Sequence, residues 1–120
     1  DDIYRRYYAL VEQLMRSGLF TQVAHPDTIK LFDIYPSYDL TPTYARLAEL
    51  AVEKDLYMED NTGCHYRYHT ADIGLSDAFL RVLLDHHVKI MTASDAHVPE
   101  HVGNYIPEAC EKIRQMEAQR

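Results

Sequence analysis

Helical and extended patterns alternate along this sequence, and that alternation restricts its fold more than any other feature. Apolar residues recur at steps of three and four over residues 3–15, which predicts a helix with one buried face. A short apolar run at residues 19–24 follows and predicts a buried strand. The same succession occurs twice more before a last helical segment. We predict the later helices near 41–52, 76–84 and 104–118, and the later strands at 56–61 and 88–93.

This order favours an α/β fold with parallel strands, because helical crossovers return each strand in the same direction. The carboxyl ends of parallel strands lie at one edge of the sheet, where ligands commonly bind. Polar residues follow each predicted strand here. His25 follows the first strand, a polar loop at 62–69 follows the second, and Asp95 with His97 follows the third. We therefore expect these side chains to converge.

Length and charge limit the classes of function. A chain of 120 residues is sufficient for one domain with its own core. The formal net charge of -7 argues against broad binding to nucleic-acid phosphates. Apolar stretches are all shorter than the ~20 residues that a membrane span needs. Without a start that resembles a signal peptide, Cys64 and Cys110 are expected to be reduced thiols in a cytoplasmic protein.

Histidine is the residue type that first suggests a chemistry, since the chain has seven of them. The Asp95-x-His97 pair places a carboxylate and an imidazole on the same side of an extended segment. These ligand types suit zinc, manganese or iron. The alternative is structural: Asp95 caps the turn before the last helix, and His97 and His25 bond to loop backbone.

Three motifs in order give a resemblance to a known family. They are Val-Ala-His-Pro-Asp at 23–27, Glu-Asp-Asn-Thr-Gly at 59–63, and Thr-Ala-Ser-Asp-Ala-His at 92–97, followed by Pro-Glu-His-Val-Gly at 99–103. With these motifs the sequence resembles the polymerase and histidinol phosphatase (PHP) superfamily, and within it the histidinol-phosphate phosphatases.

The resemblance implies that residues 1–120 form the carboxyl-terminal portion of a distorted, TIM-like (β/α)7 barrel. Family members begin with a His-x-His motif, and this sequence contains none. The amino-terminal half with that motif is therefore expected to be absent from this chain. Either that missing half or self-association through the unpaired sheet edges is expected to complete the fold.

Site residues carry over from the resemblance position by position. It implies that His25, Asp95 and His97 are metal ligands, with Zn, Mn or Fe as the divalent ion. It also implies that Arg67 is a phosphate clamp, although a solvated arginine is an equal alternative because the loop is longer than usual. Asn61 and His65 are expected to contact the substrate.

The resemblance implies a metal-dependent phosphomonoester hydrolase in which a metal-activated water attacks the phosphate. The expected substrate is L-histidinol phosphate, from histidine biosynthesis, and the isolated chain is expected to be inactive as only part of the enzyme. One alternative is a non-catalytic metal-binding or interaction domain derived from the same fold. Another is a relative that acts on a different phosphoester or as a polymerase-associated nuclease, against which the lack of basic charge counts.

Overall fold

Three short parallel strands form the centre of the fold in a computed structural model, which describes residues 1–119. They are β1 (Gln22–Val23), β2 (Tyr57–Asn61) and β3 (Lys89–Ala93), in the order β1-β2-β3. Both pairings are parallel, and Gln22, Tyr57 and Lys89 lie in register at the start of the sheet. The predicted α/β class with parallel strands is confirmed, while its place in a barrel stays a prediction.

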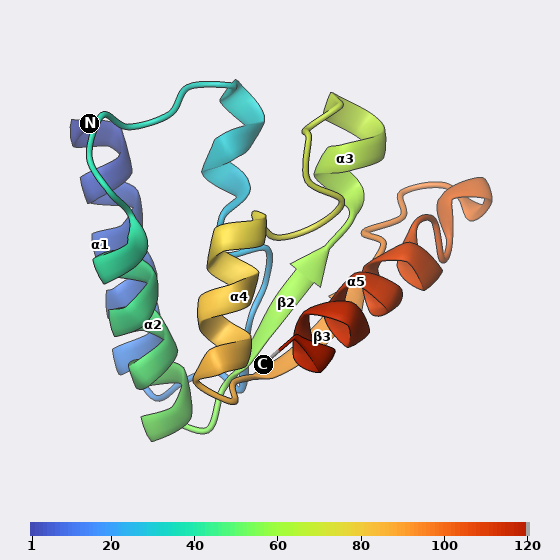
Figure 1. The fold of residues 1–120 in the computed structure, drawn as a ribbon. Coiled ribbons are helices and arrows are strands. Elements are labelled where there is room, and N and C mark those ends of the chain that lie inside the picture. Colours follow the sequence, from blue (N-terminus) through green and yellow to red (C-terminus); the bar gives the residue numbers. More distant parts are fainter. Residues whose placement is uncertain (120) are drawn as a thin grey trace.

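Helices surround the sheet unevenly. Helices α1 (Asp2–Arg16) and α2 (Thr41–Glu53) lie side by side at one flank, and α4 (Asp77–Asp85) lies between them and the sheet (Figure 1). Helix α5 (Ile106–Ala118) lies along β3 at the other flank. Helix α3 (Gly63–Tyr68) continues from the carboxyl end of β2, and two short 3-10 helices are Thr28–Phe32 and Pro99–His101.

The hydrophobic core lies between the sheet and the helices on one of its faces. Its central contact is a stack of Tyr44 from α2 on Phe79 from α4, with ring centroids 4.3 Å apart and planes 9° from parallel. Such aromatic pairs add stability beyond the area they bury. Helix α1 forms where the sequence predicts it, but its buried face differs from the predicted one: Tyr4, Tyr8, Val11 and Met15 are buried, whereas Ile3 and Leu10 stay exposed.

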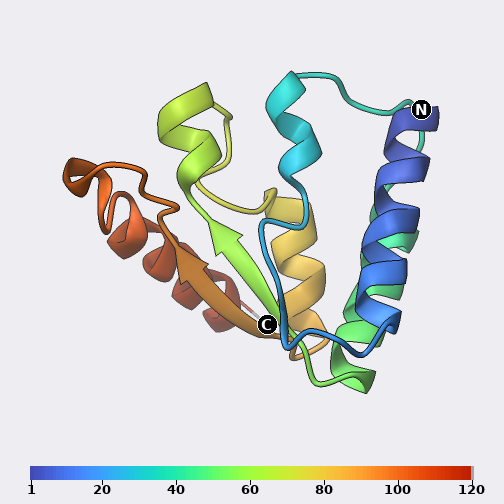
Figure 2. The ribbon, with the colours of Figure 1, turned by 180° about the vertical axis from the view of Figure 1, so that it is seen from behind.

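The other face of the sheet is open. Met58 in β2 faces the helices and is fully buried, whereas Tyr57 and Met91 point the opposite way and are 36% and 40% exposed. Figure 2 shows this face toward the viewer, with no helix of residues 1–119 over β2 and β3. Parallel sheets are usually covered on both faces. The fold therefore presents an uncovered sheet face next to the carboxyl ends of its strands.

A buried ion pair supports the turn after β1. Lys30 lies 3.1 Å from Asp27, and the two side chains are only 8% and 7% exposed. Lys30 also donates to the carbonyl of Gly74, and Asp27 accepts the N–H of Ser76 at 2.8 Å. The pair thus ties the first 3-10 helix to the segment that leads into α4.

Two predicted elements differ in the structure. The sequence predicts a loop at residues 62–69, but this segment contains α3, which begins where Asn61 Oδ1 accepts the Gly63 N–H at 2.8 Å and ends at the left-handed His69. A helix of fewer than two turns is too short to give a periodic pattern. The first strand is shorter than the predicted 19–24, because Leu19 and Phe20 remain exposed and only the last part of the run pairs with β2.

Candidate functional site

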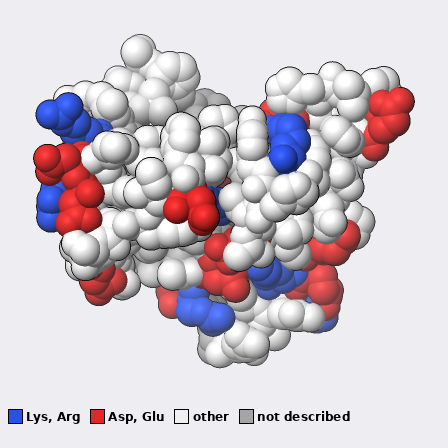
Figure 3. Space-filling model, turned by 90° about the horizontal axis from the view of Figure 1, so that it is seen from above, with Lys and Arg blue, Asp and Glu red and all other residues white. Residues whose placement is uncertain are grey.

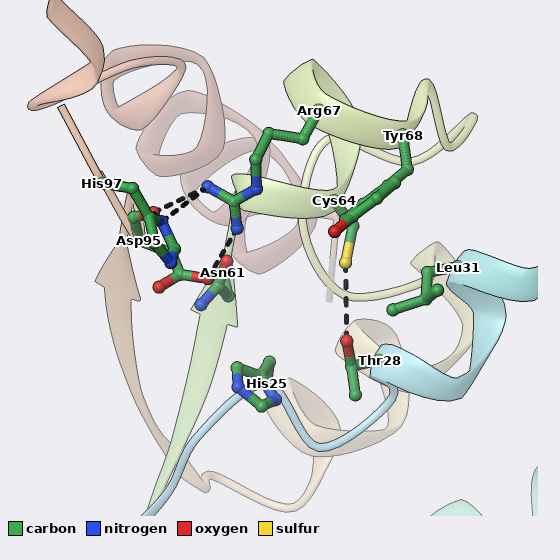
Figure 4. A pocket seen from close by; sticks show the side chains of 9 residues that line it. All are labelled: His25, Thr28, Leu31, Asn61, Cys64, Arg67, Tyr68, Asp95 and His97. Atoms are coloured by element: carbon green, nitrogen blue, oxygen red, sulfur yellow. Dashed lines mark hydrogen bonds and ion pairs between the residues drawn. The ribbon is translucent and has the colours of Figure 1, made fainter.

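A cavity of about 390 Å³ opens at the carboxyl ends of the strands, a volume within the range of small-molecule sites (Figure 4). The segments that follow all three strands contribute to it, together with α3 and the first 3-10 helix. The cavity brings together five of the six predicted site residues. It is lined by His25, Thr28, Leu31, Asn61, Cys64, Arg67, Tyr68, Asp95 and His97.

The position of His25 is fixed through its backbone. This residue follows β1 with a left-handed conformation, φ 29°, and its N–H donates to Oε1 of Glu59 at 2.9 Å. Tyr7 in α1 donates its hydroxyl to the carbonyl of Pro26 at 2.8 Å. Burial, aided by the charge of Asp27, raises the pKa of Tyr7, so this hydroxyl stays protonated and keeps donating. The turn therefore holds the His25 imidazole at the cavity wall.

Alternation along β2 separates two neighbouring carboxylates. Glu59 faces the cavity side, where it also accepts the side-chain N–H of Asn61 at 2.9 Å. Asp60 points into the opposite layer and accepts the N–H of Leu75 at 2.7 Å. Burial raises the pKa of Asp60. The sequence predicts that adjacent strand residues face opposite sides, and the contacts confirm it.

Arg67 in α3 reaches across to the turn after β3. Its Nη2 donates to Oδ2 of Asp95 at 2.7 Å, and its Nη1 donates to the Asp95 carbonyl at 2.7 Å and to the Tyr66 hydroxyl at 3.1 Å. Partial burial alone would lower the pKa of the guanidinium, but the hydrogen bond to Asp95 and nearby charges outweigh it, and the pKa is raised. Arg67 is therefore held in an ion pair with Asp95, and its role as a phosphate clamp stays a prediction.

Asp95 and His97 lie on a tight turn at the rim of the cavity. Asp95 has a left-handed backbone, φ 54°, and Nδ1 of His97 lies 2.9 Å from the Asp95 carbonyl oxygen. In the tautomer that carries the proton on Nδ1, this nitrogen donates to the carbonyl. The lone pair of Nε2 is then available to a ligand.

His65 lies apart from the five converging residues. Its Nδ1 is 2.7 Å from the carbonyl oxygen of Thr70, and its ring meets the Tyr105 ring edge-on at 4.7 Å between centroids. Neither contact is with a residue of the cavity lining. The side chain of His65 therefore leaves α3 on a side that does not line the cavity, and its predicted contact with substrate stays a prediction.

The chemistry of the donors can be compared with the predicted metal ion. His25, Asp95 and His97 offer two imidazoles and a carboxylate, which Zn, Mn and Fe all accept. Figure 4 shows His25 on one side of the cavity and the other two across it, beyond Asn61. Within residues 1–119, no group of three or more His, Cys, Asp or Glu side chains is placed to hold an ion. The donor types fit a divalent cation, as a partial set of ligands.

Two features of the cavity do not follow from the sequence reasoning. Glu59 is part of the Glu-Asp-Asn-Thr-Gly motif but is not among the predicted site residues, although its carboxylate accepts hydrogen bonds from the N–H of His25 and the side-chain amide of Asn61. Cys64 is expected only as a free thiol, but it is buried in the cavity wall with its Sγ 3.5 Å from Oγ1 of Thr28. The strand period gives a signal for Glu59, whereas Cys64 depends on the unpredicted helix α3.

The surface around the cavity is not strongly charged. Figure 3, seen from the side of the strand ends, shows acidic and basic side chains scattered and mostly toward the periphery, with no continuous basic patch among the described residues of that face. That the chain does not bind nucleic acid stays a prediction. Over residues 1–119, no helix is both long and apolar enough to cross a membrane.

Comparison with known proteins gives one informative similarity. No family model matches the chain. A protein of Deinococcus radiodurans named "Probable histidinol-phosphatase" is 34% identical over 113 residues, which make up 93% of this chain and 42% of that protein. The chain thus spans less than half the length of this relative. The match supports a histidinol-phosphatase-like relationship.

Proposed function

We propose that this chain carries part of the active site of a metal-dependent phosphomonoester hydrolase of the histidinol-phosphatase type. The observation that carries the proposal is the convergence of His25, Asn61, Arg67, Asp95 and His97 on one cavity at the strand ends. Its support from outside the chain is the 34% identity to the D. radiodurans protein.

In this proposal His25, Asp95 and His97 hold a divalent cation, together with donors from outside this chain. Such an ion, when bound, supplies charge stabilisation for the phosphate and a water of lowered pKa. The chain itself positions the ligands. Glu59 fixes the backbone of His25, and the turn carbonyl of Asp95 orients the ring of His97.

Arg67 is the proposed phosphate-binding group. A guanidinium presents its N–H groups as a planar fork that matches two phosphate oxygens. Arg67 borders the cavity and is 24% exposed, so an anion can approach it. Asn61 holds the end of β2 and the start of α3 together beside the cavity, because its amide donates to Glu59 and accepts the N–H of Gly63. His65 stays a proposed substrate contact, although its side chain does not line the cavity as the chain stands.

The proposed substrate is a small phosphorylated amino alcohol, L-histidinol phosphate. A volume of about 390 Å³ suits a ligand of that size. The name of the D. radiodurans relative supports the same choice.

The uncovered sheet face indicates what is proposed to complete the site. Tyr57 and Met91 lie exposed on it, directly below the cavity. We assign this face to further β/α units, which would close a barrel-like layer and bring the remaining metal ligands. Self-association of the chain through its sheet edges is the alternative partner.

A non-catalytic metal-binding or interaction domain is the second candidate function. Two observations favour it: within residues 1–119 the predicted ligands do not form a group of three, and Asp95 is paired with Arg67. Both argue against a complete catalytic centre among these residues. Under this alternative the chain would bind a cation without any turnover of a phosphoester.

Calorimetric titration with Zn²⁺ and Mn²⁺ tests the proposal. The chelator-stripped protein is compared with an Asp95→Ala, His97→Ala double variant and with His86→Gln, whose imidazole lies at the opposite end of the strands beside Val82. Stoichiometric binding that is lost in the double variant and kept in His86→Gln is expected. Phosphate release from L-histidinol phosphate, measured after the missing amino-terminal half of the barrel is supplied, then separates the hydrolase from the non-catalytic alternative. Binding that is unchanged in the double variant would contradict both.

A further inference from the structure

The guanidinium of Arg67 holds Oδ2 of Asp95, one of the two carboxylate oxygens that a metal cation could use. Its Nη2 is 2.7 Å from Oδ2 of Asp95, and its Nη1 is 3.3 Å from Nδ1 of His97. Figure 4 shows the guanidinium between these two side chains and the cavity. Asp95 and His97, two of the three proposed metal ligands, are thus in contact with the positive charge of Arg67.

The fold provides space for this position. A Cβ atom added to Gly63 would lie 2.5 Å from Nη2 of Arg67, so a side chain at that position would collide with the guanidinium as it now stands. Glycine at the start of α3 therefore leaves room for the guanidinium of Arg67 next to the Gly63 Cα. The ion pair depends on this close approach as well as on the charge of Asp95.

A divalent cation and the guanidinium compete at Asp95. Arg67 already holds Oδ2 of the carboxylate, and two positive charges at contact distance repel each other. The two groups are not equally fixed, because Arg67 has a long side chain and stays 24% exposed. Arg67 can therefore leave Asp95 when a better anion is offered within its reach.

We propose that Arg67 exchanges between Asp95 and a bound phosphate group, and that this exchange couples anion binding to cation binding. A tetrahedral dianion in the cavity draws the guanidinium away and leaves the Asp95 carboxylate to the cation. By linkage, the bound cation displaces Arg67 toward the anion and raises anion affinity by the same factor. The site then loads cation and phosphate together, and the resting chain binds each weakly. This inference rests on the proposed function.

The test measures cation affinity with and without an anion. Mn²⁺ is titrated calorimetrically into the chelator-stripped protein in buffer alone and in sulfate, a tetrahedral dianion that keeps Mn²⁺ in solution. In the wild type, sulfate is expected to raise Mn²⁺ affinity by about tenfold, a usual size for coupling between sites. In Arg67→Gln, Mn²⁺ affinity without sulfate is expected to rise by about the same factor, and the sulfate effect to disappear.

Two further variants separate this exchange from general charge effects. Arg81→Gln removes an exposed arginine that bonds to Gln119, far from the cavity, and is expected to behave as the wild type does. Gly63→Ala keeps the charge of Arg67 but removes its resting space, and is expected to raise Mn²⁺ affinity without sulfate. Circular dichroism of each variant checks that it is folded.

The outcomes distinguish this inference from the proposed function. A fall in Mn²⁺ affinity in Arg67→Gln, or a sulfate effect that persists in it, would overturn the exchange and leave the hydrolase proposal standing. Mn²⁺ binding that is absent even from Arg67→Gln in sulfate would also overturn it. Conversely, full coupling with no phosphate release from L-histidinol phosphate, even when the missing amino-terminal half is supplied, would overturn the hydrolase and leave the exchange intact.

Discussion

Replacing Lys30 by Met should be the most damaging single change outside the cavity. Methionine keeps much of the length and volume of the side chain but leaves Asp27, which is 7% exposed, as a buried carboxylate without its cation. The carbonyl of Gly74 loses a donor as well. The change therefore tests whether this ion pair stabilises the turn that carries His25.

The expected loss follows from the contacts. Removing one partner of a buried ion pair costs about 3–5 kcal/mol. Asp27 retains one hydrogen bond, from the N–H of Ser76 at 2.8 Å, which places the cost at the lower end. Loss of the donor to Gly74 adds about 1 kcal/mol. A total of about 4 kcal/mol is a large part of the ~5–15 kcal/mol that stabilises an ordinary domain.

Urea unfolding followed by circular dichroism measures this loss. With an m-value of about 1–3 kcal/mol per molar urea, the midpoint of Lys30→Met should fall by about 2 M. Lys54→Met, at an exposed position after α2, is the matched control and should change the free energy of unfolding by less than about 0.5 kcal/mol.

A double variant decides whether the unpaired charge is the cause. In Asp27→Asn, Lys30→Met the carboxylate is gone, while the amide oxygen can still accept the Ser76 N–H. We expect the double variant to recover at least half of the lost stability. A cost of less than about 1 kcal/mol for Lys30→Met, or a double variant no more stable than the single one, would refute this reasoning.

Three further predictions concern the core and the open sheet. Gly74→Ala should destabilise the fold by about 1–3 kcal/mol in the same urea assay, because the new Cβ would collide with the buried carboxylate of Asp60. A cost near zero would contradict this, since the backbone around Gly74 would then have shifted without loss of stability. Burial raises the pKa of Asp60 in the folded protein above its ordinary 3.8. The folded state therefore binds this proton more tightly than the unfolded chain does. The contribution of Asp60 to stability falls as the pH rises from 3.8 through the folded pKa. Asp60→Asn should remove that loss, and urea midpoints from pH 4 to 8 that fall as steeply in the variant would contradict it. Finally, the exposed Tyr57 and Met91 on the open sheet face predict that the average mass from light scattering rises with concentration, and a monodisperse monomer at high concentration would argue against this.

Much of the fold can be predicted from the sequence because its helices and strands differ in hydrophobic period. The three- and four-residue steps of α1 and the compact apolar run of β3 each indicate one kind of element. The convergence at the strand ends follows from parallel pairing alone. The sequence is therefore sufficient to place His25 and Asp95 at one edge of the sheet.

Other parts depend on contacts that a sequence pattern does not contain. The start of α3 is fixed by the side chain of Asn61, and its six residues are too few to repeat a pattern. The ion pair of Arg67 with Asp95 requires that α3 turn back over the end of β3. The family resemblance suggests that Arg67 binds an anion, but the anion that it meets here belongs to the chain itself.

The order of the strands also bears on how the chain folds during synthesis. Because β1, β2 and β3 occupy the sheet in the order in which they leave the ribosome, each new strand adds to an exposed edge, and none has to enter between two that are already paired. Each parallel pairing still has to wait for the crossover helix that precedes the incoming strand. Within this chain, growth can therefore proceed one helix-and-strand unit at a time in sequence order, at the pace of translation.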